Sequence, residues 1–470
     1  MSKNKLLKIL LPSIALTFGS QANAYTLHEA VTHTLATSPD FLIAANTRDT
    51  IDKDLRGAYA DYLPVLDLTA GWGEQYTNNP TTRFQNPLVG GSTSLAQEGT
   101  QNLTRTEFGL IATQMIFDGF GVYHNVAGKK ARVKAESWRV NGAAQDAVMG
   151  AVQAYLEVLL RRELVGLNRD NLNVHETIFG QIHKRSEGGI GRKADMDQAE
   201  GRVALARTNL MAEEANLNDA ETEFLRKVGI PVPSHLVRPE HPHGFPSSEL
   251  VAIETGLKRN PILIASIEDT NVTREAYRGA RAPFMPRLDL QLGMNRNHNI
   301  DGSPGDSDDN TAMLRVRWNL FSGGKDLAKI CENAYRMQEA IEVQRRAHRQ
   351  VIESVRLAWS THQTAARQLR YFREHVEASV RTTSAYEKQF NIGQRTLLDV
   401  LDSQNELFGA RTALANGRHI ELLSIYKVLQ AMGCLTDDLG LQLPRQAEPR
   451  PTGVMAGAFG FFERNSSLFD

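Results

Sequence analysis

The sequence predicts an α+β fold built from two copies of one unit, each with a short helix, two amphipathic β-strands and two long coiled-coil helices. Three observations lead to this prediction. Residues of the first half of the chain recur at regular spacing in the second half. Four segments alternate between apolar and polar residues, as half-buried strands do. Four longer segments carry apolar residues three and four positions apart, as packed helices do.

The repeat consists of matched residues at a spacing of 222, then 204, then 202. The matched pairs include, in that order of spacing, Pro39/Pro261, Pro64/Pro286, Asp67/Asp289, Gly71/Gly293, Phe117/Phe321, Gly119/Gly323, Ile190/Ile392, Gly191/Gly393 and Asp197/Asp399. The fall from 222 to 204 indicates one insertion of 18 residues in the first copy, between Gly71 and Phe117. Such self-similarity indicates a duplicated structural unit. The predicted divisions are a first repeat at 25–228, a connector at 229–247, a second repeat at 248–440 and a C-terminal tail at 441–470.

The first 24 residues are typical of a secretory signal peptide. A basic start is followed by the apolar stretch 9–18 and by Ala22-Asn23-Ala24, which resembles a cleavage site. Cleavage there removes Lys3, Lys5 and Lys8 and leaves 50 basic and 54 acidic residues, a net charge of −4. Nucleic acid binding needs a concentrated basic surface, so no nucleic acid partner is expected. No apolar run of 18 residues follows the signal, so no transmembrane helix is predicted.

Four strands are predicted, at about 64–78, 102–117, 286–296 and 311–321. In each of them apolar and polar residues alternate, so that one face is apolar and the other is polar and exposed to water. This pattern fits the wall of a membrane barrel, and it fits two hairpins of a soluble sheet equally well. Because single-chain barrels need at least eight strands, a barrel would require several protomers.

Helical patterns follow the strands in each copy. Two segments, about 122–186 and 325–390, would each reach roughly 95–100 Å as single helices, and returning helices are predicted at about 194–228 and 396–432. Short helical segments are predicted before the strands, at about 26–60 and 248–282. Helices of this length must pack on each other or on neighbouring protomers.

These residues resemble the TolC-like outer-membrane channel family (the outer membrane factors), and within it the type I secretion branch. The resemblance lies in YLPVLDL at 62–68 with its repeat MPRLDL at 285–290, in IFDGF at 116–120 with NLFSGG at 319–324, and in FNIGQRTLLDVLD at 390–402. It covers roughly residues 25–440. Each motif alone is modestly specific, whereas their order and duplication together are highly specific.

The resemblance implies a homotrimer with a 12-stranded β-barrel in the outer membrane of a Gram-negative bacterium and a helical barrel across the periplasm. It also implies a passive export channel that is opened by a periplasmic adaptor (membrane fusion) protein and an inner-membrane ABC exporter or other pump. The family hydrolyses nothing itself, so neither an enzyme nor a cofactor is expected. Alternatives are the outer-membrane channel of a multidrug efflux pump and a periplasmic coiled-coil scaffold or adaptor.

The resemblance also implies a periplasmic gate. Arg395, Asp399 and Asp402 match the family's gate residues in the second copy, and Asp197 matches the acidic residue of the first copy. A structural interpretation stays open for each position: Arg395 and Asp399 have the spacing of an ordinary i,i+4 ion pair, and Asp197 near a helix start offsets the helix dipole. Phe390 stands where family members carry Tyr, which removes one hydroxyl between helices.

No catalytic, cofactor-binding or metal-binding residues are predicted. His28 and His33 are spaced i,i+5, which is one residue more than a zinc protease helix requires. The acidic run 306–310 lacks the Gly and the distal Glu of a calcium loop. Cys331 and Cys434, the only two cysteines, are interpreted as helix-packing residues.

Overall fold

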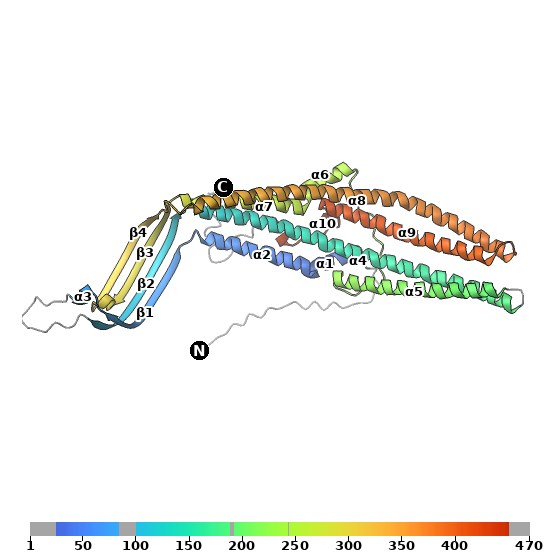
Figure 1. The fold of residues 1–470 in the computed structure, drawn as a ribbon, viewed down its shortest axis with the longest axis horizontal. Helices are drawn as coiled ribbons and strands as arrows, with labels where there is room; N and C mark the ends of the chain where they lie inside the picture. Colours follow the sequence, from blue (N-terminus) through green and yellow to red (C-terminus); the bar gives the residue numbers. More distant parts are fainter. Residues whose placement is uncertain (1–24, 84–99, 189–191, 243, 451–470) are drawn as a thin grey trace, which may run out of the picture. The chain divides into compact units, whose positions relative to one another are not determined.

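The computed structural model describes residues 25–83, 100–188, 192–242 and 244–450 (Figure 1). The helices are α1 (Leu27–Thr37), α2 (Pro39–Ala60), α3 (Pro80–Arg83), α4 (Gly121–Glu187), α5 (Lys193–Val228), α6 (Glu249–Arg259), α7 (Pro261–Gly279), α8 (Lys325–Asn391), α9 (Leu397–Met432) and α10 (Leu435–Asp438). The strands are β1 (Val65–Thr77), β2 (Gln101–Phe117), β3 (Arg287–His298) and β4 (Asp306–Arg317). The predicted α+β fold is confirmed. The predicted signal peptide and the last part of the tail, 451–470, lie outside the described residues.

The described residues fall into two compact units. The first takes its described residues from within the segments Met1–Ala36, Ala151–His241 and Phe372–His419, and the second from within Thr37–Gly150, Pro242–Tyr371 and Ile420–Asp470. Each unit therefore contains segments of both sequence repeats. Equivalent helices of the two copies pack within the same unit, so the repeats are units of sequence and not separate domains.

Each short helical segment is broken by a proline. The sequence predicted one helical segment per copy, but α2 begins at Pro39 and α7 at Pro261. The residues before these prolines, Ser38 and Asn260, have nearly the same extended backbone, with φ −62° and ψ 119° and with φ −63° and ψ 120°. Proline disfavours helical geometry in the preceding residue and fits the first turn of a new helix. Each copy therefore begins with two helices.

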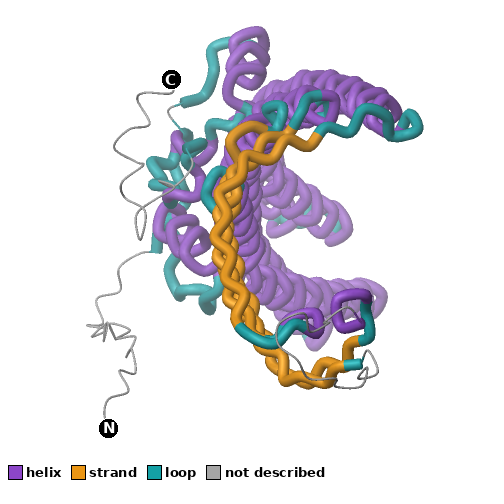
Figure 2. The backbone as a smooth tube through the Cα atoms, turned by 90° about the vertical axis from the view of Figure 1, so that its left-hand side faces the viewer, coloured by secondary structure: helices purple, strands orange, loops and turns teal. Residues whose placement is uncertain are grey.

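The four strands form one antiparallel sheet in the order β1-β2-β3-β4 (Figure 1). Figure 2 shows them in orange. The strand order places β1 and β4 at the edges, and β2 pairs with β3 where the two repeats meet. The fourth strand starts at Asp306 and ends at Arg317, whereas alternation had placed it at 311–321. It ends there because its last partner is Arg287, the first residue of β3.

The two faces of the sheet differ in polarity. Residues directly opposite in neighbouring strands point to the same face, so rows such as Leu66–Ala112–Leu292–Ala312 form one apolar face. The apolar face carries Leu66, Leu68, Ala70, Trp72, Phe108, Leu110, Ala112, Leu288, Leu290, Leu292, Met294, Ala312, Leu314 and Val316. The opposite, polar face carries Asp67, Thr69, Arg105, Glu107, Thr113, Arg287, Asp289, Gln291, Asn295, Asp309, Arg315 and Arg317. Leu66 is 66% exposed and Trp72 is 81% exposed, so no element of the described chain covers the apolar face.

The long helices pack as antiparallel pairs. Helices α4 and α8 have 67 residues each, which corresponds to roughly 100 Å, and α5 and α9 have 36 residues each. In the first unit, α4 and α5 are joined by ion pairs along their length. The pairs are Arg161–Glu213 at 3.1 Å, Arg169–Glu214 at 3.1 Å and Arg207–Glu176 at 2.7 Å. Among the described residues, no helix is both long and apolar enough to cross a membrane.

The two cysteines have different environments, which corrects one prediction. Cys434 is buried and packs in an apolar cluster of the second unit with Leu263, Val351 and Val355. Cys331 is exposed on α8. Helical spacing identified a helix at Cys331 but could not tell which of its faces meets a neighbour within the chain.

Tyr155 on α4 fixes the segment that precedes α1 to the connector in the first unit. Its side chain is fully buried, and its hydroxyl oxygen lies 2.7 Å from the carbonyl oxygens of both Tyr25 and Val237. The same oxygen accepts the N–H of Val237 at 3.0 Å. Burial raises the pKa of Tyr155 to about 12. The hydroxyl therefore holds two chain segments that meet in a short parallel bridge between Tyr25 and Leu236.

We expect Tyr155→Phe to lower the free energy of unfolding by about 1–2 kcal/mol, because it leaves buried backbone groups without their hydroxyl partner. Thermal or denaturant unfolding of the purified protein measures this loss. Tyr335→Phe, which removes a hydroxyl from a ring that is 78% exposed, is the matched control. Equal unfolding curves for both variants would contradict the role of Tyr155.

Candidate functional site

Three of the four predicted gate residues lie in the first unit at the turn between α8 and α9, Arg395 in the turn itself and Asp399 and Asp402 in the first two turns of α9. Helix α8 ends in a reversal at Gly393, whose φ of 78° is left-handed and therefore favours glycine. The N–H of Gly393 bonds to the Phe390 carbonyl at 3.0 Å, and that of Gln394 bonds to the Gln389 carbonyl at 2.8 Å. These two bonds form a Schellman cap, which terminates α8 and redirects the chain.

Asp399 takes part in the start of α9. Its carboxylate accepts the backbone N–H of Thr396 at 3.0 Å and the Thr396 hydroxyl at 2.8 Å, while Thr396 Oγ1 accepts the Asp399 N–H at 3.3 Å. This reciprocal arrangement is a capping box. The Thr396 hydroxyl, the Thr396 N–H and the charge of Arg395 together lower the pKa of Asp399. Asp399 is therefore ionised at neutral pH and serves the helix start.

Arg395 connects the two helices that meet at the turn. Its guanidinium lies 4.2 Å from the centre of the Tyr386 ring on α8, and its Nε donates to the Gln389 side chain at 3.0 Å. On the other side it lies 3.8 Å from the Asp399 carboxylate. The structure thus brings Arg395 and Asp399 together, as their spacing suggested, and adds two contacts to the preceding helix.

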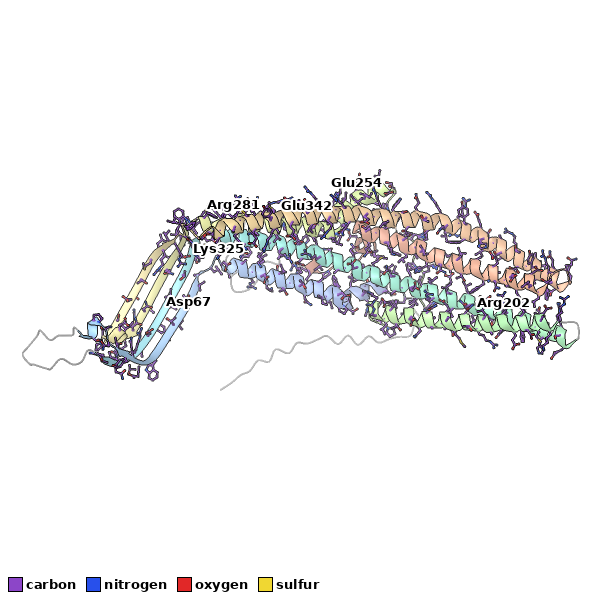
Figure 3. All side chains as sticks on the ribbon, viewed as in Figure 1. Asp67, Arg202, Glu254, Arg281, Lys325 and Glu342 are labelled. Carbon is purple, nitrogen blue, oxygen red and sulfur yellow. The ribbon has the colours of Figure 1, made fainter. Side chains whose placement is uncertain are left out.

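Asp402 faces a different helix. Its carboxylate lies 3.5 Å from the guanidinium of Arg202, which α5 of the first repeat supplies (Figure 3). Both side chains are partly exposed, so the pair is accessible to water and ions. The sequence analysis did not identify Arg202, because it lies on another helix and belongs to none of the motifs. This ion pair links the equivalent helices of the two repeats.

The remaining predicted position lies apart from these contacts. Asp197 is exposed on the second turn of α5, and among the described residues it forms none of the ion pairs above. The turn that precedes α5, at 189–191, lies outside the described residues. Phe390 contacts another helix instead, since the Arg185 guanidinium of α4 lies 4.8 Å from its ring centre. Cation–π contacts of this kind are typical of arginine near aromatic rings.

An apolar cluster lies beneath the turn and holds it. Helices α4, α5 and α9 contribute buried side chains, against which Tyr386 and Phe390 of α8 pack. The buried members are Ile178, Ile182, Ala199, Leu397, Val400 and Leu401. The charged residues of the turn therefore stand on a packed four-helix end.

A buried histidine lies close to the Arg202–Asp402 pair. His175 of α4 is only 3% exposed, and among the described residues its Nδ1 has no hydrogen-bond partner. Burial lowers the pKa of His175, the positive charge of Arg202 lowers it further, and a hydrogen bond with Asn405 of α9 opposes the shift. The imidazole is therefore neutral at neutral pH, which the sequence analysis did not predict.

The described residues contain no group of three or more His, Cys, Asp or Glu side chains that could hold a metal ion. The acidic run at 306–310 belongs to β4 instead. Asp306 lies 2.7 Å from His298, and Asp308 lies 3.4 Å from Arg296, both on the neighbouring strand β3.

The fold is that of outer-membrane channels. It superposes on the crystal structure of the CmeC outer membrane channel of Campylobacter jejuni with a TM-score of 0.76 and 16% identity, covering 87% of this chain and 86% of that one. At this identity the likeness concerns the fold alone.

The outer membrane efflux protein family model matches residues 30–229 and 252–431. The chain belongs to this family, which confirms the resemblance to TolC-like channels, and it is an outer-membrane channel protein that extends into the periplasm. It is 27% identical over 405 residues to the outer membrane efflux protein BepC of Brucella suis, covering 84% of this chain and 88% of that protein. It is 22% identical over 461 residues to the proteases secretion protein PrtF of Dickeya chrysanthemi, covering 95% and 97%.

We expect the folded protein to lose stability as the pH falls below about 6.5, the ordinary pKa of histidine. Because the pKa of His175 is lowered in the folded state, the unfolded state binds more protons in this range and is stabilised relative to the folded state. His175→Gln should flatten the dependence of the melting temperature on pH between about 7 and 5. Burial also lowers the pKa of His419, so part of the slope should remain.

His348→Gln, which replaces an exposed histidine of α8, is the control and should leave the slope unchanged. A His175→Gln protein with the wild-type slope would show that this imidazole does not govern the acid response.

Proposed function

We propose that the chain is the outer-membrane and trans-periplasmic export duct of a tripartite type I secretion system and acts as a passive conduit. The observation that carries the proposal is the sheet with one apolar and one polar face, whose strands are followed in each copy by a helix of 67 residues. The apolar face fits contact with lipid, and the polar face fits a water-filled interior. The long helices have the reach needed to continue such a passage beyond the membrane.

The proposed assembly is a homotrimer. The sheet has four strands and two open edges, β1 and β4, and open edges are not tolerated in the hydrocarbon region of a bilayer. Four strands cannot close on themselves, because the smallest single-chain barrels have eight. Three copies would supply 12 strands and leave no edge. The exposed apolar face of the sheet would then contact lipid on the outside of the barrel.

The proposed partners are a periplasmic adaptor protein and an inner-membrane ABC exporter or other pump, which would supply the energy. A passive conduit needs no catalytic group of its own. The name of the relative PrtF supports protein secretion as the process. A second candidate is the outer-membrane channel of a multidrug efflux pump, and the name of the relative BepC supports efflux as the process.

A deletion strain would test the proposed function. If the channel serves type I secretion, we expect specific proteins to disappear from the culture medium and to return on complementation. The sensitivity of the strain to small toxic compounds is measured in parallel. Increased drug sensitivity with an unchanged set of secreted proteins would contradict the secretion proposal and favour the efflux channel.

We also propose that Asp197, Arg395, Asp399 and Asp402 form the periplasmic gate of this channel. Three contacts support a holding role for Arg395, because they tie the start of α9 to the end of α8. The Asp402–Arg202 pair supports a second holding point between the repeats. In a threefold assembly the acidic residues would recur as rings and would favour the passage of cations.

Arg395→Ser should raise the single-channel conductance in planar lipid bilayers by about twofold or more, because it releases the contacts to Tyr386, Gln389 and Asp399 and widens the constriction. Arg381→Ser, which removes an exposed charge from the same part of α8, is the control. Equal conductance of the wild type and Arg395→Ser would argue against a gate at this turn.

A further inference from the structure

The charged side chains of β2 and β3, the two interior strands of the sheet, are paired within the chain. On the polar face Arg105 pairs with Glu107, and Arg287 lies 3.0 Å from Asp289. On the opposite face Arg296 and His298 pair with the neighbouring acidic residues of β4. Unpaired charges among the described strand residues therefore lie on the edge strands.

Three of these unpaired charges lie at one end of the sheet. Asp67 is the third residue of β1 (Figure 3), and Arg315 and Arg317 are the last charged residues of β4. All three are exposed and point to the polar face, and among the described residues none has an ion-pair partner. The two open edges of the sheet thus carry opposite charge on the same face and at the same end.

We propose that Asp67 of one copy pairs with Arg317, and diagonally with Arg315, of a second copy of this chain, and that this ion pair fixes the register in which the two edges join. The inference rests on the proposed assembly, in which β1 of each copy meets β4 of the next. A slip of one residue would turn the apolar residues to the wrong face. A slip of two residues keeps every side chain on its own face, so polarity alone does not define the register.

The charges distinguish the registers that polarity leaves equivalent. In an antiparallel pair of strands, the residue number rises along one strand as it falls along the other. Asp67 opposite Arg317 therefore places Leu68 opposite Val316 and Glu74 opposite Asn310. If Asp67 stood opposite Arg315 instead, Glu74 would face Asp308, and like charges directly opposite are destabilising.

The chosen register also accounts for the residues beyond β4. It places Leu66 opposite Trp318, which is 55% exposed and follows the last β4 residue paired with β3. Trp318 continues the alternation of β4, and within this chain no β3 residue remains to pair with it. A neighbouring copy would supply that partner.

The register has a consequence for the whole assembly. In a closed barrel the offset between strands determines the tilt of the strands and the diameter of the lumen. The nine strand pairings inside the three sheets are fixed by each chain, so only the three seams between copies leave this offset undetermined. The ion pair would therefore set the width of the passage.

Charge reversal tests the proposal on the full-length protein in detergent. The readout is the temperature at which the trimer dissociates on a denaturing gel. Asp67→Arg, and Arg315→Asp with Arg317→Asp, should each lower this temperature by about 5–10 °C, and combining all three substitutions should restore it. Asp309→Arg, an exposed charge on the same face and edge strand but at the other end, is the control and should have no effect.

Disulfide formation tests the register itself in a Cys331→Ser background. Asp67→Cys with Arg317→Cys should link neighbouring copies, because opposite strand positions bring the two Cα atoms within disulfide range. Asp67→Cys with Asp309→Cys should not. A stable wild-type trimer in which single reversals have no effect, or in which the 67–317 pair does not cross-link, would overturn the ion pair and leave the assembly intact. A monomeric wild type would overturn the proposed assembly together with the pair.

Discussion

The rest of the structure depends on a sheet that is incomplete within one chain. Its backbone groups are satisfied between β1 and β4 but not beyond them, and its apolar face has no cover. An exposed edge invites pairing with another chain. In lipid this pairing becomes obligatory, because no water is present to satisfy the edge groups. In the proposed assembly, the passage would therefore form only when several copies join.

Duplication explains how a single chain supplies such a sheet. Each copy contributes one hairpin, and the two hairpins join through β2 and β3. The same duplication places equivalent helices of the two copies side by side, so that each compact unit draws on both halves of the chain. The ion pair between Arg202 and Asp402 is one contact that joins equivalent helices of the two copies. The copies are similar in sequence, yet neither encloses a core of its own.

Much of the fold could be predicted from the sequence, because the repeat, the strand alternation and the helix periodicity are local patterns. The breaks at Pro39 and Pro261 were not predicted, although both residues were part of the repeat, because periodicity continues across a proline that starts a new helix. The end of β4 was missed for another reason. Alternation reports the two faces of a strand, whereas the partner strand decides where pairing stops.

In the candidate site, too, local contacts could be predicted from the sequence and contacts between distant segments could not. The contact between Arg395 and Asp399 follows from a spacing of four residues. The partner of Asp402 is 200 positions away, and helical spacing does not say which neighbouring helix a side chain will meet. The burial of His175 could likewise not be predicted from local sequence patterns, because it depends on how α4, α5 and α9 pack.

The capping box at the start of α9 limits how this channel could diversify. Asp399 accepts two hydrogen bonds that begin a helix, so its charge cannot be exchanged without loosening the first turn. Asp402 does not take part in this cap, and its carboxylate pairs with Arg202, which is accessible to water. If these residues form the proposed gate, variants with altered ion preference should arise in evolution at Asp402 or Arg202, while Thr396 and Asp399 persist together or change together.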